Sequence, residues 1–180
     1  MPIVCAVRRG IRVAALVLSV LSACSDSGAG TLPSTSPTGS LSMTAPTSSA
    51  SLDARTEIRN ALHAYFDALY AAGLDPANNT TALAALIEPT CSCYRVVEVL
   101  REEARQGRYI DYRYALSDVK VVDVDSRGGD VNYTVRRSEG AERDRTGRVI
   151  QRFEATTEKY SAHFARTNDV LRLDRVTRFA

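Results

Sequence analysis

The spacing of apolar residues changes once along this chain, and that change limits the folds that the chain can adopt. Between residues 54 and 106 the apolar residues recur every three or four positions, as on one face of an α-helix. After Gly107 they alternate with polar residues, as in half-buried strands. Helices followed by strands are typical of an α+β protein. We therefore predict N-terminal helices packed on one face of a curved, four-stranded antiparallel sheet.

Three helices are predicted, over residues 54–72, 80–88 and 93–106. In each of them the apolar residues fall on one face when they are counted at 3.6 residues per turn. Asp53 is the expected N-cap of the first helix, and Gly107 is expected to end the third. The inward residues expected on the first helix are Ile58, Leu62, Phe66 and Leu69, with Tyr65 at the margin.

The strands are expected to form a meander over residues 110–124, 131–135, 149–166 and 170–179. In the first strand the apolar residues change to the other face after Asp118, which predicts a β-bulge or a sharp bend there. Residues 138–148 are mostly polar and are expected to form a loop.

The N-terminus has the features of a secretory signal. Arg8, Arg9 and Arg12 precede an apolar run over residues 13–23, which is shorter than the about 20 residues that a membrane-spanning helix needs. The run ends in L-S-A-C, which resembles the lipobox of bacterial lipoproteins and implies cleavage before Cys24 and a lipid on its thiol. The domain boundaries then predicted are 1–23 for the signal, 24–52 for a tether and 53–180 for one folded domain. The alternative is ordinary secretion with Cys24 free.

Lipidation at Cys24 would place the protein on the extracytoplasmic face of the cell membrane. Residues 24–52 contain one charged residue, Asp26, and no aromatic residue, so they are expected to be a disordered tether. The full chain has 23 basic and 21 acidic side chains, and loss of three signal arginines would bring its net charge close to zero. This balance gives no reason to expect nucleic-acid binding.

The order of the elements after Asp53 resembles the cone-shaped fold of the nuclear transport factor 2 superfamily, also called SnoaL-like. The whole layout resembles certain actinobacterial lipoproteins of unknown function. These have a lipobox, a Ser/Thr/Pro tether, a helix of the pattern I-x-x-x-L-x-x-Y-F and then a cysteine pair. In that group the pair is C-x-x-C, whereas here it is Cys91-Ser92-Cys93.

The cysteine pair has several interpretations. Cys91 and Cys93 would be the only free thiols of the exported protein, and an oxidising exterior favours a disulfide. Residues i and i+2 point apart on a regular helix, so the bond requires an extended or turn-like segment, which Pro89 and Thr90 favour. A redox-active pair, a soft-metal site and two unpaired thiols remain the alternatives.

Few other residues suggest chemistry. His63 and Asp67 are four residues apart on the flank of the first helix, where an exposed ion pair is expected rather than an acid–base pair. His163 is expected to have a structural role or to line a pocket. No phosphate-binding loop, nucleotide motif or metal cluster is evident, so no cofactor or metal is predicted. The candidate pocket residues are Tyr112, Tyr114, Tyr133, Phe153 and His163, although aromatic core packing is the stronger interpretation of the first four.

These features predict a membrane-anchored lipoprotein whose domain binds a protein partner or a small ligand without catalysis. The resemblance to the cone fold implies either a ligand pocket or a homodimer formed through the sheet. The alternatives are an isomerase- or cyclase-type enzyme that uses the cone cavity, and a thiol–disulfide protein that uses Cys91 and Cys93.

Overall fold

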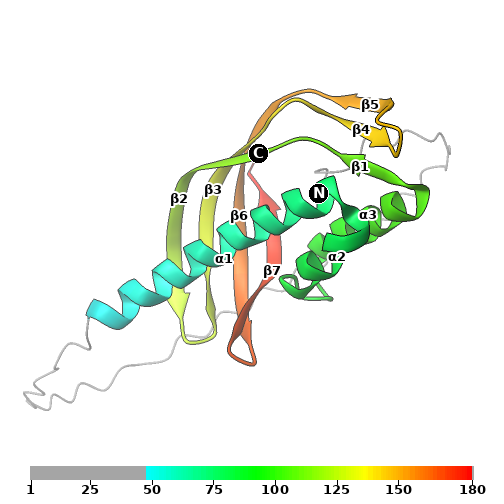
Figure 1. Ribbon diagram of the computed structural model, residues 1–180. Helices are drawn as coiled ribbons and strands as arrows, with labels where there is room; N and C mark the ends of the chain where they lie inside the picture. The colour runs from blue at the N-terminus through cyan, green and yellow to red at the C-terminus, as the bar shows by residue number, and fades with distance from the viewer. Residues whose placement is uncertain (1–47, 180) are drawn as a thin grey trace, which may run out of the picture. The chain divides into compact units, whose positions relative to one another are not determined.

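The computed structural model of the chain describes residues 48–179. Three α-helices come first, with a short 3₁₀ helix before the third, and strands follow (Figure 1). The helices are α1 (Ser48–Leu74), α2 (Pro76–Ala85), η1 (Ser92–Tyr94) and α3 (Arg95–Gln106). The strands are β1 (Arg108–Ile110), β2 (Tyr114–Asp125), β3 (Gly128–Arg137), β4 (Gly140–Asp144), β5 (Val149–Phe153), β6 (Thr156–Thr167) and β7 (Val170–Arg178).

The strands form two antiparallel sheets. The main sheet has four strands in the order β2-β3-β6-β7, which is the meander expected from the sequence. A smaller sheet has the order β1-β4-β5. Figure 1 shows α1 running across one face of the main sheet, with α2 and α3 beside its C-terminal half. The predicted fold class, an α+β protein with helices on a curved four-stranded antiparallel sheet, is confirmed.

The core lies between α1 and the concave face of the main sheet. Ile58 and Leu62 of α1 are almost fully buried, as are Tyr160 and Phe164 of β6. The apolar face predicted for the first helix is therefore the buried one.

Charged side chains in the N-terminal half of α1 bind the helix to the main sheet. Arg55 donates to the carbonyl oxygen of Val121 at 2.8 Å, and Arg166 forms two hydrogen bonds with Glu57 at 3.0 and 2.6 Å.

The helix boundaries differ from those predicted. α1 begins at Ser48, so Asp53 is not its N-cap and residues 48–52, which were assigned to the tether, are helical. No glycine or proline interrupts the chain between residues 48 and 72, so helical conformation extends beyond the apolar pattern. The lipidation site Cys24, the signal and the rest of the tether lie outside the described residues.

The second helix lies about four residues before its predicted position. Asp75 caps α2, since its side chain accepts a hydrogen bond from the backbone N–H of Asn78, and Pro76 occupies the first turn. Asp75 followed by Pro76 was therefore a stronger signal for the start of a helix than the residues at the predicted start. Gly107 ends α3 as predicted, with a left-handed φ of 66° that favours glycine.

Strand β2 contains the predicted irregularity at Asp118. The register with β3 shifts between Ser117 and Lys120, and Asp118 itself has a φ of 53°. Its carboxylate accepts a hydrogen bond from the Thr134 hydroxyl of β3 at 3.0 Å, which holds the bulge against the neighbouring strand. The parity change in the sequence therefore marked a real β-bulge.

Two predictions about the strands were wrong. Residues 138–148 are not only a loop, because β4 lies within them, and the expected strand 149–166 is divided at Glu154 and Ala155 into β5 and β6. Strand β4 reads G-A-E-R-D, so it lacks the apolar alternation that would identify it. It is stabilised instead by charge pairs, including Arg108 with Glu142 at 2.9 Å and Arg143 with Asp111 at 2.6 Å.

None of the helices within residues 48–179 is both long and apolar enough to cross a bilayer.

Candidate functional site

A pocket lies on the concave face of the main sheet, where β2 and β6 begin and β3 and β7 end. Register brings its residues together: Tyr114 faces Arg137 across β2 and β3, and Val135 faces Glu158 across β3 and β6. The volume within the pocket that the centre of a water molecule can occupy is about 70 Å³. We call it the concave-face pocket, and its lining residues are Phe66, Tyr114, Val135, Arg137, Thr156, Glu158 and Tyr160.

Glu158 is the acidic group of this pocket, and two neighbours hold its carboxylate. The hydroxyl of Tyr160 donates to one oxygen, and the guanidinium of Arg178 lies 3.0 Å from the other. Burial and the hydrogen bond to Glu158 raise the pKa of Tyr160 well above its ordinary value. The phenol therefore stays protonated at neutral pH and acts as a hydrogen-bond donor.

Arg137 is the basic group of the pocket. Its guanidinium carbon lies 5.0 Å from the ring centroid of Tyr112 and 5.6 Å from that of Phe153, so the group packs against two aromatic rings. One terminal nitrogen donates to the carbonyl oxygen of Glu154 at 3.1 Å. Its Nε is buried and has no hydrogen-bond partner within residues 48–179. A buried donor of this kind is satisfied when an acceptor is bound beside it.

The charges of the pocket do not cancel. Among residues 48–179, Arg178 is paired with Glu158, whereas Arg137 bonds only to a neutral carbonyl group. Arg178 lies beside the pocket and outside its lining, and together with Arg137 and Glu158 it gives this region one excess positive charge. The pocket therefore favours a ligand with one negative charge or a strong acceptor oxygen.

The aromatic residues predicted as pocket or core form one continuous array. Tyr112 contacts Phe153 with ring centroids 5.6 Å apart and Tyr114 with centroids 5.3 Å apart. The array continues through Phe66 to Tyr133, whose centroids are 5.7 Å apart. Of these predicted residues, Tyr114 lines the concave-face pocket. Tyr112 and Tyr133 are buried, in agreement with the core interpretation, although Tyr112 also lines a second opening, and Phe153 is half-buried.

His163 is not among the lining residues of this pocket, so of its two expected roles the structural one agrees with its position. The inward residues of β6 are Tyr160, Ala162 and Phe164, and His163 alternates with them. It lies on the outer face, where its Nδ1 is 3.1 Å from the carboxylate of Asp130. The prediction treated residues 149–166 as one strand and therefore placed His163 on the same face as Phe153. The break after Phe153 changes which residues of β6 face inward.

His63 and Asp67 are exposed on α1. The structure therefore places neither of them in the concave-face pocket, as the flank position predicted.

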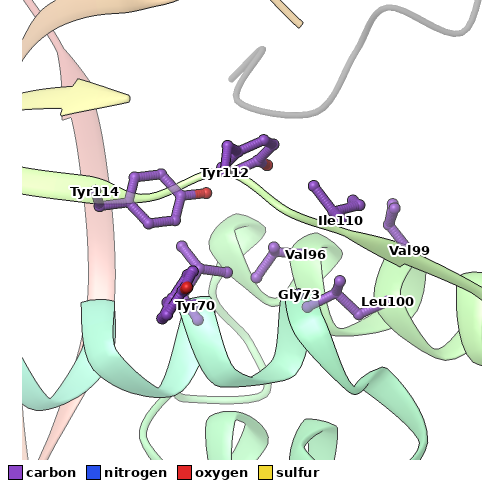
Figure 2. Close-up of a pocket in the computed structure, with 9 residues that line it drawn as sticks. Tyr70, Gly73, Val96, Val99, Leu100, Ile110, Tyr112 and Tyr114 are labelled. Atoms are coloured by element: carbon purple, nitrogen blue, oxygen red, sulfur yellow. The ribbon is translucent and has the colours of Figure 1, made fainter. Parts of the chain in front are cut away.

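A second, narrower opening lies between α1, α3 and the segment that joins β1 to β2 (Figure 2). We call it the α1–α3 crevice. It offers only about 10 Å³ to water centres, which is about one water molecule. Apolar residues dominate its walls, and Tyr114 lines it as well as the concave-face pocket. Its apolar walls include Leu69, Gly73, Val96, Val99, Leu100 and Ile110.

Cys91 and Cys93 are paired, with their sulfur atoms in contact and their Cα atoms 5.0 Å apart. Cys91 is the N-cap of η1, and its extended backbone gives the non-helical geometry that the pairing requires. Both residues are buried, and Cys93 packs against the carbonyl of Leu173 on β7. Within residues 48–179 no three His, Cys, Asp or Glu side chains are grouped so as to hold a metal ion.

The sequence analysis did not identify three charged residues of this candidate site, which are Arg137 and Glu158 in its lining and Arg178, which pairs with Glu158. Their signal was present in the alternation, because Val131, Tyr133 and Val135 place Arg137 on the same face of β3. An inward charged residue at the end of an apolar face indicates a pocket or an ion pair. The division between β5 and β6 hid the corresponding alternation of Glu158.

No family model and no curated protein sequence matches this chain. Solved structures do match its fold. The intermembrane space region of the chloroplast protein ARC6 has a TM-score of 0.54 at 16% identity, covering 71% of this chain and 97% of that one.

Two proteins from Novosphingobium aromaticivorans have similar structures. One, described as an aromatic ring hydroxylase, has a TM-score of 0.51 at 14% identity and covers 71% of this chain and 88% of its own. The other, described as a scytalone dehydratase, has a TM-score of 0.50 at 12% identity and covers 72% of this chain and 87% of its own. These likenesses show the fold alone, which is an arrangement of helices packed on a curved antiparallel sheet.

Proposed function

We propose that this chain is a lipoprotein, anchored through Cys24 to the extracytoplasmic face of the cell membrane. Its domain binds a small ligand in the concave-face pocket without catalysis. The observation that carries the binding proposal is the buried Nε of Arg137, which has no hydrogen-bond partner within residues 48–179. Leaving such a donor unpaired costs about 1–3 kcal/mol, which a ligand acceptor would recover.

The walls define the rest of the ligand. Phe66, Tyr114 and Val135 supply apolar surface beside the polar groups. A volume of 70 Å³ for water centres holds about five to seven non-hydrogen atoms, at about 10–15 Å³ for each. A small carboxylate or carbonyl compound with a ring or a short chain fits these properties.

The binding proposal is tested by calorimetric titration of the full-length protein with benzoate, which has one carboxylate and one ring. The carboxylate and the adjoining part of the ring match the volume of the pocket, and the far edge of the ring would lie at its mouth. Arg137→Met should abolish measurable binding, because it removes the donor and the excess charge. Arg136→Met is the matched control, since Arg136 is exposed on the opposite face of β3 and changes the net charge equally. Equal loss in both variants, or no binding by the unaltered protein, contradicts the proposal.

The anchoring proposal is supported by the basic segment, the short apolar run and the L-S-A-C motif. Intact-mass measurement of the protein from its own host should give a chain that begins at Cys24 and carries acyl groups. Cys24→Ala should release the protein from the membrane fraction. An unprocessed, unmodified chain would remove the anchoring claim and leave the pocket claim untouched.

An enzyme is the second candidate, because Glu158 and Tyr160 are adjacent inside the pocket. The chemistry of Glu158 and Tyr160 disfavours an acid–base reaction. The carboxylate is already bonded by Arg178 and Tyr160, and the raised pKa of Tyr160 keeps its proton in place. An efficient acid or base needs a pKa near the working pH. An acid–base reaction predicts that Glu158→Gln abolishes turnover of a bound compound while retaining its binding.

The thiol–disulfide alternative is disfavoured by burial. Cys91 is 7% exposed and Cys93 is 3% exposed, whereas a reactive thiol must be reached by its partner. We therefore propose that the pair has a structural role at the start of η1.

A further inference from the structure

Tyr114 has an unusual position, because its side chain lines two openings of the domain. It belongs to the wall of the concave-face pocket and to the wall of the α1–α3 crevice. Figure 2 shows its ring above α1, with its hydroxyl directed toward the crevice. The ring therefore separates the two openings.

Neighbouring rings hold Tyr114 in this position. Its centroid is 5.2 Å from that of Phe66 and 5.3 Å from that of Tyr112, and both contacts are edge-to-face. Arg137 lies directly opposite Tyr114 in the register of β2 and β3. The separating ring therefore stands next to the group that would hold the ligand acceptor.

The space beyond Tyr114 is apolar. Leu69 and Gly73 of α1 form one wall of the crevice, and Val96 and Leu100 of α3 form another. A side-chain carbon added at Gly73 would lie 3.2 Å from the carbonyl oxygen of Ile110, so the helix approaches the chain closely there. An alkyl chain would find hydrophobic contacts in this crevice and no charged side chain among its lining residues.

We propose that Tyr114 is the specificity-determining residue of the concave-face pocket, because its ring closes the passage to the crevice and restricts ligands to short carboxylates. This inference rests on the proposed binding function. Removing the ring would join the two spaces, so that the tail of a longer carboxylate continues into the crevice. Each additional buried CH₂ group should then tighten binding about fourfold.

The test uses straight-chain carboxylates from propanoate to decanoate, titrated into the full-length protein. Tyr114→Val removes the ring and retains a β-branched residue suited to a strand. Tyr114→Phe is the matched control, because it retains the ring and loses only the hydroxyl. Val99→Ala is a second control, because it widens the crevice without opening the passage. Circular dichroism and thermal melting establish that each variant is folded.

For the unaltered protein and both controls, the affinity should stop rising beyond about pentanoate, the size set by the pocket volume. For Tyr114→Val, it should continue to rise through octanoate, about fourfold for each carbon. Should Tyr114→Val not fold, Tyr114→Leu serves in its place, because its smaller side chain also lacks the ring.

Two negative results have different meanings. If the unaltered protein binds short carboxylates and the ring-removed variant shows the same dependence on chain length, the role of Tyr114 is overturned and the binding function stands. If neither binds any carboxylate, including benzoate, the binding function itself is overturned together with this inference.

Discussion

Tyr160 donates its hydroxyl hydrogen to the carboxylate of Glu158, and the two side chains lie on the concave face of the main sheet. Arg178 of β7 pairs with the same carboxylate at 3.0 Å. Neighbouring strands thus fix one negative charge inside the pocket, and Arg137 remains as a positive charge without a partner carboxylate in the described part of the chain. This division of charge is the basis of the proposed ligand preference.

The bond between Tyr160 and Glu158 should contribute to stability. Tyr160→Phe removes the hydroxyl and leaves the ring stacked on Tyr133. We expect a loss of about 1–2 kcal/mol in the free energy of unfolding, since the bond is to a charged acceptor. Urea denaturation measures this change, and an unaltered midpoint would show that the hydrogen bond makes no net contribution.

The bulge in β2 should depend on the residue at position 118. Asp118→Asn should change the unfolding free energy by less than about 0.5 kcal/mol, because asparagine adopts a positive φ and can still accept from Thr134. Asp118→Ala should cost about 2 kcal/mol, because it combines left-handed strain with loss of the hydrogen bond. Equal stability of the two variants would contradict this explanation of the bulge.

The cysteine pair should stabilise the domain only modestly, because it closes a loop of three residues. The loop-entropy relation extrapolates to about 1.6 kcal/mol. A reducing agent should therefore lower the melting temperature of the unaltered protein by a few degrees and leave a variant with alanine at both positions unaffected. Benzoate binding should persist after reduction. Loss of binding without loss of stability would instead support a redox role.

Glu103 should make stability depend on pH. Burial, followed by the nearby Glu142 carboxylate, raises the pKa of Glu103, while Arg108 opposes the change. A carboxyl group whose pKa is raised by folding costs stability when it is ionised, and this cost disappears as the pH falls below its unfolded value. Glu103→Gln should therefore raise the melting temperature at pH 7 by about 2 °C.

The advantage of Glu103→Gln should shrink toward pH 4, where the native glutamate is protonated. Glu102→Gln is the control, because the Glu102 side chain is 45% exposed on the same helix and pairs with Arg105. An advantage that stays constant from pH 7 to pH 4 would show that ionisation of Glu103 is not its source.

The sequence predicted the parts of the fold that depend on apolar periodicity. The inward face of α1, the end of α3 at Gly107, the bulge at Asp118 and the four-strand meander all follow from local patterns. The small sheet was missed because Arg108–Glu142 and Arg143–Asp111 pairs, rather than alternating apolar residues, support β4. Such pairs join residues more than 30 positions apart, which a local pattern cannot indicate.

The candidate site was only partly predictable, for a related reason. Tyr114 and its aromatic neighbours could be identified as an inward set. Arg137 and Glu158 belong to the pocket because β3 and β6 are paired in one particular register, in which Val135 lies opposite Glu158. A single continuous strand over 149–166 gave the wrong parity and brought His163 inward instead.

The most direct test of the account is made at the Nε–H group of Arg137. Its ¹⁵N-edited NMR signal, assigned with Arg137→Met, can be followed while benzoate is added to the full-length protein. We predict a saturable shift of this signal with little change in the Nε–H signal of Arg136. A signal for Arg137 that does not move at saturating benzoate, or that moves no more than that of Arg136, would contradict the claim that this buried donor binds the ligand.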